Sequence, residues 1–340
     1  MEKIGFALIG AGLWGQAHAN VYATHPYARL VAVCDVVEEK AKGLAQQYGV
    51  PWYVDYREML KDPEIKAVGI ATPDFAHCDP LVECVKAGKA VLVEKPLATT
   101  REDVDRIMEA ITRYSGRVMV DFHARWSPPF AVAKDCIDRG ELGQIISAYY
   151  RLNDTISVPM SMLSWAAASS ILWFLGSHSV DTLRFLLNDE VKRVYSVSRS
   201  EVLVKKGIDA PDIFQTTLEF KSGVIAQIEN NWIVPNTNPN VNDTKLNILG
   251  SKGMINMDLT HNQAVERYLE DKSDHPDILV KPLIHGKYMG FAYESIRDFV
   301  ERVATGRDFL VTAEDGAKVT SVILSIMESA KKREPVEVAY

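Results

Sequence analysis

Three features that would place the chain in a special class are absent from its sequence. It has no dense basic run and its net charge is −7, whereas a nucleic-acid partner needs a basic surface that displaces counterions from phosphates. The apolar stretch Ile4–Ile9 is only as long as a strand and runs directly into glycines, which argues against a membrane span or an export signal. We therefore expect no nucleic-acid partner, no membrane attachment and a cytoplasmic location.

Cysteine is scarce, with four residues in the chain: Cys34, Cys78, Cys84 and Cys136. No two of them form a C-x-x-C pair, and their spacing fits neither a zinc site nor a disulfide framework. Free thiols, most of them buried, and no bound metal are the expectation.

The length of 340 residues exceeds what one ordinary core supports and predicts two domains. The composition, 47% hydrophobic and 24% charged, is that of an ordinary globular protein. No internal repeat or low-complexity segment is visible.

The first 120 residues alternate short apolar runs with helical patterns. Strands are predicted at Ile4–Ile9, Leu30–Cys34, Ala67–Ala71, Ala90–Val93 and Val118–Val120, and helices at roughly 13–25, 37–48, 76–87 and 101–114. The apolar runs are continuous rather than alternating, which indicates strands buried on both faces under two helix layers. We therefore predict an α/β fold whose first domain, residues 1–122, is a doubly wound parallel sheet of the Rossmann type.

The pattern changes after residue 122. Strand-like runs with hairpin punctuation fill 144–152 and 191–258, and helical stretches lie near 129–139, 171–187, 291–304 and 314–332. Strands that follow one another through tight turns pair antiparallel. Residues 123–340 are predicted to form an α+β domain with an open, mainly antiparallel sheet and helices on one face. Whether the C-terminal segment packs back on the first domain stays open.

The sharpest local motif is Gly10-Ala11-Gly12-Leu13-Trp14-Gly15, which follows a predicted strand and opens a predicted helix. In that context Gly10 allows a tight turn, Gly12 lets the backbone approach a pyrophosphate, and Gly15 lets the helix pack close to the strand. The helix N-terminus then offers free N–H groups to the phosphates. The motif predicts a dinucleotide site.

Asp35 stands 20 residues after Gly15, at the end of the second predicted strand. A carboxylate there accepts hydrogen bonds from both ribose hydroxyls and repels a 2′-phosphate. Val36 and Val37 supply no cation for such a phosphate, so NAD is favoured over NADP. The turn Ala71-Thr72-Pro73 ends the third long strand and is expected to border the same ligand.

Glu94-Lys95-Pro96 follows the apolar strand Ala90–Val93, at the same edge of the sheet. A lysine at a strand end over the cofactor can bond a substrate hydroxyl and stabilise negative charge on oxygen. The predicted cofactor-binding positions are Gly10, Gly12, Leu13, Trp14, Gly15, Asp35, Thr72, Pro73, His77, Glu94 and Lys95.

These motifs occur together with Gly176-Ser177-His178-Ser179-Val180-Asp181 and the hairpin Gly250-Ser251-Lys252-Gly253. In that order they resemble the glucose-fructose oxidoreductase/inositol dehydrogenase (Gfo/Idh/MocA) family over nearly the whole chain. The resemblance implies a Rossmann domain followed by an open antiparallel sheet, and tightly bound NAD(P). It further implies hydride transfer at a carbon of a sugar or cyclitol, and homodimers or homotetramers built through the C-terminal sheets.

The resemblance also implies two catalytic residues. Lys95 corresponds to the family's active-site lysine, and His178 to the histidine that exchanges the hydroxyl proton as hydride leaves or arrives. Asp181, three residues further along the same helix, is expected to orient or bond the substrate. The substrate-binding positions predicted here are Asp181, Arg125, Trp165, Asn231 and Tyr288, with Asn230 and Trp232 as further candidates.

The chain departs from the family at Phe174, where many members carry an acidic residue four positions before the histidine. A phenyl ring on the same helix face as His178 would desolvate the imidazole, which predicts a neutral His178 with a lowered pKa. Alternatively the polar role has moved to Asp121, His123 or Arg125.

Three functions remain open from the sequence. The first is a sugar or cyclitol dehydrogenase, or the corresponding ketose reductase. The second is an enzyme that retains NAD and uses transient oxidation for elimination or glycoside cleavage, which Phe174 keeps open. The third is a nucleotide-binding sensor without activity, against which the intact Lys95 and His178 argue.

Overall fold

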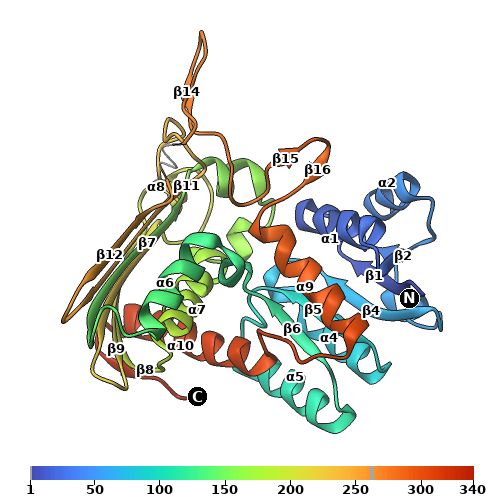
Figure 1. The fold of residues 1–340 in the computed structure, drawn as a ribbon, viewed down its shortest axis with the longest axis horizontal. Coiled ribbons are helices and arrows are strands. Elements are labelled where there is room, and N and C mark those ends of the chain that lie inside the picture. The colour runs from blue at the N-terminus through green and yellow to red at the C-terminus, as the bar shows by residue number, and fades with distance from the viewer. Residues whose placement is uncertain (1, 261–263) are drawn as a thin grey trace. The chain divides into compact units, whose positions relative to one another are not determined.

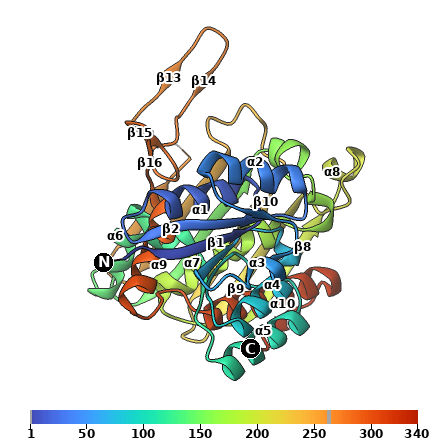
Figure 2. The same cartoon turned by 90° about the vertical axis from the view of Figure 1, so that its right-hand side faces the viewer.

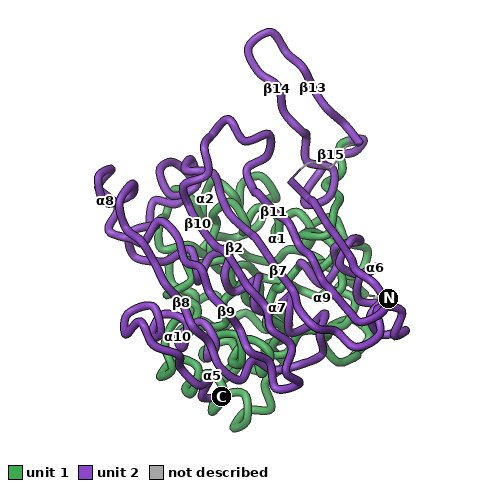
Figure 3. The backbone as a smooth tube through the Cα atoms, turned by 90° about the vertical axis from the view of Figure 1, so that its left-hand side faces the viewer, with its two compact units in different colours: residues 1–123, 286–320 green, residues 124–285, 321–340 purple. Residues whose placement is uncertain are grey.

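The computed structural model describes residues 2–260 and 264–340. The chain divides into two compact units (Figure 3). Unit 1 comprises residues 1–123 and 286–320, and unit 2 comprises residues 124–285 and 321–340.

Unit 1 is built on a six-stranded parallel sheet in the order β3-β2-β1-β4-β5-β6. Its strands are β1 (Ile4–Ile9), β2 (Ala28–Cys34), β3 (Trp52–Tyr53), β4 (Ile65–Ile70), β5 (Ala90–Glu94) and β6 (Val118–Asp121). This is the doubly wound order in which a dinucleotide lies across the carboxyl ends of the strands. The predicted fold class is confirmed, and the two-residue β3 is the strand that the sequence did not predict.

Two helix layers cover this sheet. The helices are α1 (Leu13–Thr24), α2 (Glu38–Tyr48), α3 (Tyr56–Met59), α4 (Cys78–Lys86), α5 (Arg101–Tyr114) and α9 (Phe291–Thr305). Helix α1 lies beside β1 and β2 (Figure 2) and contacts α9, while α4 and α5 pack together on the other side. Phe299 of α9 meets Phe6 of β1 with ring centroids 6.0 Å apart, so a late segment of the chain completes the core of unit 1.

Unit 2 contains a seven-stranded sheet in the order β12-β11-β7-β10-β9-β8-β17. Its strands are β7 (Ile145–Asp154), β8 (Val191–Arg199), β9 (Ile213–Phe220), β10 (Ile225–Asn231), β11 (Asn242–Gly250), β12 (Met254–Asp258) and β17 (Val336–Glu337). The predicted hairpins β9–β10 and β11–β12 are antiparallel as expected. Strands β7 and β10, which are not consecutive in the chain, pair parallel, so the sheet is mixed although mainly antiparallel.

Helices pack on one face of the unit 2 sheet, as predicted (Figure 1). They are α6 (Pro128–Asp138), α7 (Ser177–Leu187) and the later part of α10 (Ala313–Lys332), while α8 (Val202–Lys205) is a single turn. Phe130 of α6 meets Tyr150 with ring centroids 6.1 Å apart. Ser329 Oγ of α10 accepts a 2.9 Å hydrogen bond from the Ser196 N–H. Tyr149 and Ile225 lie on the other, exposed face.

The loop at 274–287, for which the sequence shows no period, contains parts of two short hairpins. They pair β13 (Arg267–Tyr268) with β14 (Ser273–Asp274), and β15 (Leu283–Ile284) with β16 (Lys287–Tyr288). The four cysteines are free, and Cys34, Cys78 and Cys84 are buried, which confirms that the thiols are unpaired and mostly buried. Among the helices of the described residues, none is long and apolar enough to cross a membrane.

Candidate functional site

The glycine motif forms the turn between β1 and α1, and each glycine has a distinct role. Gly10 has φ +98°, and a Cβ atom there would lie 2.5 Å from the carbonyl oxygen of Ala71. A Cβ at Gly15 would lie 1.9 Å from the Gly10 carbonyl oxygen, so the helix could not pack this close to the strand. A Cβ at Gly12 would meet open space. Space at Gly12, beside the N-terminus of a 12-residue helix without an acidic residue in its first turn, fits a pyrophosphate.

Asp35 ties this turn to the end of β2. Its Oδ2 accepts a 2.8 Å hydrogen bond from the Ala11 N–H, and its Oδ1 accepts one of 2.8 Å from the Val37 N–H. Each carboxylate oxygen has further lone pairs, so the side chain can still accept hydrogen bonds from ribose hydroxyls. Leu13 and Val36 are exposed near this edge, and Trp14 is half-buried.

The loops after β4 and β5 are braced by His77. Its Nδ1 lies 2.6 Å from the carbonyl oxygen of Pro96, and its Nε2 lies 3.1 Å from that of Thr72. Burial lowers the pKa of His77 despite these carbonyl contacts, so the imidazole is neutral at pH 7 and donates one hydrogen bond. Thr72 itself donates to the Ala76 carbonyl oxygen at 3.1 Å. His77 thus joins the Thr72-Pro73 turn to the segment that carries Lys95.

Lys95 is buried at the end of β5, beside a cluster of buried polar residues. His18 of α1 places Nε2 3.2 Å from Glu94 Oε1, and its Nδ1 lies 3.0 Å from the Tyr22 hydroxyl. Burial, followed by the nearby carboxyl groups of Asp121 and Glu94, raises the pKa of Tyr22 well above its ordinary value. The phenol therefore keeps its proton and donates to Nδ1, which leaves Nε2–H to donate to Glu94.

Asp121 and His123 follow β6 at the same edge. The ligand atoms of Asp121, His18 and Glu94 all lie within 4.8 Å of one another. Burial lowers the pKa of His123 to about 4, so its ring is neutral at pH 7. This ring stacks on Trp14 with centroids 5.3 Å apart. Two of the three residues that the sequence offered as an alternative polar group, Asp121 and His123, therefore lie in the surroundings of Lys95.

In unit 2, two residues predicted to bind substrate bind each other. Arg125 donates two hydrogen bonds to the Asp181 carboxylate, of 2.6 Å and 3.0 Å. The Arg125 guanidinium also lies 5.2 Å from the ring centroid of Phe185. Asp181 is fully buried, so its carboxylate is satisfied by an internal ion pair.

The segment before His178 differs from the regular helix that the sequence predicts over 171–187. Leu172–Gly176 form a π-helical turn, and α7 begins only at Ser177. The four-residue spacing from Phe174 to His178 therefore crosses from this π-helical turn into α7, and the predicted effect of the phenyl ring on the pKa of His178 stays a prediction. The ring of Phe174 lies 6.3 Å from that of Trp165 and 6.1 Å from that of Trp232. His178 is buried at the start of α7.

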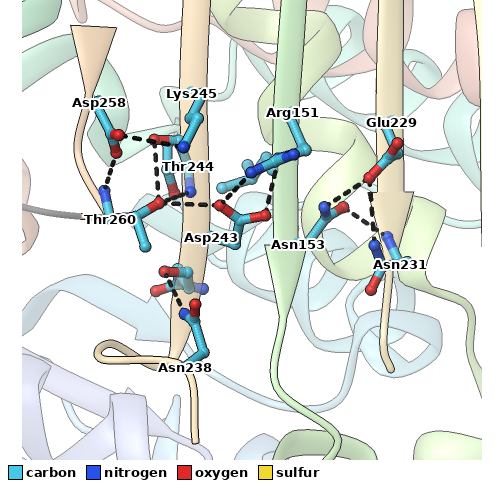
Figure 4. A network of polar contacts seen from close by, with 12 residues as sticks. Arg151, Asn153, Glu229, Asn231, Asn238, Asp243, Thr244, Lys245, Asp258 and Thr260 are labelled. Atoms are coloured by element: carbon cyan, nitrogen blue, oxygen red, sulfur yellow. Dashed lines mark hydrogen bonds and ion pairs between the residues drawn. The ribbon is translucent and has the colours of Figure 1, made fainter. Parts of the chain in front are cut away.

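Neighbouring asparagines on β10 face opposite sides of the unit 2 sheet. Asn230 donates to Ser179 Oγ of α7 at 3.0 Å. Asn231 lies on the other face, where its backbone N–H donates to Asn153 Oδ1 at 2.9 Å and its amide to Glu229 Oε1 at 3.4 Å (Figure 4). Asn231, which the sequence predicts as a substrate ligand, thus lies in a cross-strand polar network, while Asn230 faces the helix of His178.

Tyr288, also predicted to bind substrate, belongs to unit 1. Its ring stacks on Tyr293 of α9 with centroids 5.2 Å apart and planes within 2°. The side chain is partly exposed at the end of a short hairpin. Trp165 is half-buried just before a 3-10 turn, Ala166–Ala168, in unit 2.

Sequence reasoning missed His18 and Tyr22. Both lie one helical turn apart on the buried face of α1, where they read as ordinary core residues. A signal was present in β4: a Cβ at Gly69 would lie 2.7 Å from His18 Nδ1 and 2.6 Å from the Tyr22 hydroxyl. A glycine inside a buried strand marks a close approach, here by the two polar side chains of α1.

Comparison with known proteins agrees with this geometry. The family model "Oxidoreductase family, NAD-binding Rossmann fold" matches residues 4–122, and the "GFO/IDH/MocA C-terminal domain" matches residues 130–256.

Two curated relatives match almost end to end. The chain is 29% identical to scyllo-inositol 2-dehydrogenase (NAD(+)) of Bacillus subtilis, over 99% of this chain and 96% of the relative. It is 27% identical to levoglucosan dehydrogenase of Pseudarthrobacter phenanthrenivorans, over 99% of both. Among solved structures, scyllo-inositol dehydrogenase from Lactobacillus casei with bound NAD(H) and scyllo-inositol superposes with a TM-score of 0.83, at 21% identity and over 100% of both chains. The chain belongs to the Gfo/Idh/MocA family of oxidoreductases, whose first domain is an NAD-binding Rossmann fold.

Proposed function

We propose that the chain catalyses NAD-dependent hydride transfer at a hydroxyl-bearing carbon of a cyclitol or a related sugar. The observation that carries this proposal is the glycine turn, with open space at Gly12 beside an uncapped helix N-terminus and a buried Lys95 at the same edge of the sheet. The relatives named as inositol and levoglucosan dehydrogenases support the substrate class.

The proposal favours NAD over NADP. Asp35 presents a carboxylate at the end of β2, and Val36 beside it is exposed and uncharged. A 2′-phosphate would meet a negative charge and no cation, whereas ribose hydroxyls can donate to the carboxylate. Gly10, Gly12, Leu13, Trp14 and Gly15 would hold the pyrophosphate, and Thr72 and Pro73 would border the cofactor.

Lys95 and His178 are the two proposed catalytic residues. When bound, the nicotinamide ring accepts the hydride that leaves the substrate carbon. Lys95 would bond the reacting oxygen and stabilise its negative charge, and His178 would take the hydroxyl proton, so that an alcohol becomes a ketone. In the reverse direction His178 returns the proton. Arg125 and Asp181 would shape the pocket as a preformed ion pair, with Trp165 as a stacking surface.

We also propose that copies of the chain pair through the exposed face of the unit 2 sheet, in a dimer or tetramer. Tyr149, Tyr195 and Ile225 are large apolar residues exposed on that face. Exposed apolar groups on a broad sheet are typical of subunit interfaces. Light scattering of the wild type and of Ile225→Lys tests this, and a monomeric wild type would contradict it.

The activity is tested with purified protein, a panel of inositols and sugars, and either NAD or NADP, by following the absorbance of the reduced cofactor. We expect reduction of NAD with at least one cyclitol or sugar, and a large loss of turnover in both Lys95→Ala and His178→Ala. Lys134→Ala, on a surface helix of unit 2, is the matched control and should retain turnover. Cofactor binding without reduction, or near-normal turnover in both alanine variants, would contradict the proposal. Glycoside cleavage without net NADH would replace it by the NAD-retaining alternative.

A further inference from the structure

Two buried carboxyl groups lie side by side at the end of the unit 1 sheet. Glu94 and Asp121 are register partners at the carboxyl ends of the adjacent parallel strands β5 and β6. Glu94 is 5% exposed and Asp121 is not exposed at all. Two ionised carboxylates this close in a buried site repel each other, and neither is well solvated. One of them is therefore expected to hold a proton.

The surroundings differ between the two carboxyls. Glu94 accepts a hydrogen bond from His18 Nε2, a contact that favours its ionised form. Neither oxygen of Asp121 has a hydrogen-bond partner of normal geometry among the described residues. A buried carboxylate without donors is costly, whereas a protonated carboxyl group can itself donate to a neighbouring carboxylate. The proton therefore belongs on Asp121.

The groups that face the pair act in the same direction. Burial alone would raise the pKa of Glu94, but the hydrogen bond from His18 and the positive charge of Lys95 help to bring it below its ordinary value. Burial and the negative charge of Glu94 raise the pKa of Asp121 well above its ordinary value. The nearby hydroxyl of Ser295, a residue of α9, and the positive charge of Lys95 act in the opposite direction but are outweighed.

The remaining titratable neighbours add no further charge to the pair. Burial keeps His123 neutral at pH 7 by lowering its pKa to about 4. The raised pKa of Tyr22 keeps its phenol protonated. The two carboxyls then carry one negative charge, which balances the ammonium group of Lys95.

We propose that Asp121 is a positioning residue that holds a proton at neutral pH and shares it with Glu94, so that a single negative charge holds Lys95 in place. The role toward Lys95 rests on the proposed function, whereas the shared proton does not. Two charges would cost more than burial allows, and a neutral pair would lose its attraction to the ammonium group of Lys95. Because the two carboxyls interact, they titrate as a pair, with the proton mainly on Asp121.

A divalent metal ion is the competing occupant, since His18, Glu94 and Asp121 place their ligand atoms within 4.8 Å of one another. Two observations favour the proton. Both ring nitrogens of His18 already have hydrogen-bond partners, and the positive charge of Lys95 acts on both carboxyls. A metal ion would have to displace a hydrogen-bond partner of His18, and it would be repelled by the positive charge of Lys95.

The pH dependence of unfolding tests the proton without any substrate. Above about pH 4 the unfolded chain releases the Asp121 proton while the folded chain keeps it, so this residue makes the wild type less stable as the pH rises. In the variant Asp121→Asn the amide that replaces the carboxyl group does not titrate. We expect the unfolding constant of the wild type, divided by that of Asp121→Asn, to rise by up to about tenfold per pH unit between about pH 5 and 8.

The matched control is Asp212→Asn, the same change at a buried site of unit 2, where the carboxylate accepts three backbone N–H bonds of 2.7 to 2.8 Å. It should not show the rising ratio. A ratio for Asp121→Asn that stays flat or falls with pH would mean that Asp121 is ionised in the folded protein, and would overturn the proposal.

Infrared spectroscopy of the wild type keeps the proposal testable even if Asp121→Asn does not fold. We expect the carbonyl band of a protonated carboxyl group at neutral pH, shifted by D2O and by carbon-13-labelled aspartate. Absence of that band, or one equivalent of a divalent metal in the purified protein by elemental analysis, would overturn the proposal. Neither measurement needs turnover, so a chain that oxidises no cyclitol would still decide the question.

Discussion

Arg125 forms a bidentate ion pair with the carboxylate of Asp181, with N–O distances of 2.6 Å and 3.0 Å, in the interior of unit 2. The side chains are 12% and 1% exposed. A planar guanidinium and a carboxylate fit each other in this geometry, which fixes both side chains and leaves the Asp181 oxygens occupied.

Removal of one partner of this pair should be strongly destabilising. Asp181→Ala leaves a largely buried guanidinium without its counter-charge, and we expect a loss of about 3–5 kcal/mol in unfolding free energy. The exposed pair Arg193–Glu219, with an N–O distance of 2.6 Å, is the control, and Glu219→Ala should cost far less. Urea unfolding followed by circular dichroism measures both. Equal losses would show that burial of the Arg125–Asp181 pair has no energetic consequence.

Gly12 and Gly15 should respond differently to the same added methyl group. In Gly15→Ala the new Cβ would lie 1.9 Å from the Gly10 carbonyl oxygen, so α1 must shift and stability should fall by about 1–3 kcal/mol. In Gly12→Ala the Cβ meets no protein atom within 4 Å, so stability should hold while NAD affinity falls, because the methyl group occupies the space proposed for the pyrophosphate. Thermal melts and NAD titration by calorimetry separate the two effects. Wild-type NAD affinity in a folded Gly12→Ala would place the cofactor elsewhere.

Cofactor choice should be reversible at the end of β2. Asp35→Ser with Val36→Arg removes the carboxylate and adds a cation for a 2′-phosphate. Loss of hydrogen bonds to a charged group is worth about 1.5–3 kcal/mol, so KM for NAD should rise by roughly 10- to 100-fold while KM for NADP falls. Val36→Arg alone is the control, since it keeps the carboxylate that repels the phosphate. If the ratio of KM for NAD to KM for NADP is unchanged in the double variant, Asp35 does not determine the choice of cofactor.

Thiol reactivity should report the burial of the cysteines. Burial raises the pKa of Cys34 to about 12 and that of Cys78 to about 12, and Cys84 is completely buried, so these thiols should react slowly in the folded protein. The contact with Glu141 also raises the pKa of Cys136, but this thiol is half-buried on α6 and should react first because reagent can reach it. A maleimide time course in native buffer should show one fast equivalent for the wild type. The variant Cys136→Ser should lose this fast equivalent. Full denaturation of the wild type should raise the number of reactive thiols to four. Several fast equivalents in the folded wild type would contradict the packing around β2 and α4.

Sequence reasoning succeeded where local chemistry decides the structure. The turn at Gly10–Gly15 was predictable because its glycine spacing lies directly between an apolar strand and a helix, and Gly15 packs on the Gly10 carbonyl oxygen within the same motif. The hairpin at Gly250–Gly253 was predictable because turn residues there join two strands that are consecutive in the chain. Continuous apolar runs likewise predicted the buried parallel strands of unit 1.

Sequence reasoning failed where partners come from distant parts of the chain. His18 and Glu94 are 76 residues apart and meet only after α1 packs on the sheet. Asn230 and Asn231 point to opposite sides as any neighbours in a strand do, but which of the two faces α7 is decided by how the sheet packs on that helix. The parallel pairing of β7 with β10 could not be predicted from turns, because no turn joins them.

The π-helical turn Leu172–Gly176 affects which side chain lies one turn before His178. Such a turn holds about one residue more than an α-helical turn, and each helical residue represents a rotation of about 100°. Deletion of a single residue there would restore regular α-helical spacing, since the longer turn completes the same revolution with one residue more, and would bring a different side chain to the position one turn before His178. The side chain next to the histidine can therefore change by one insertion or deletion in this turn while α7 keeps its register.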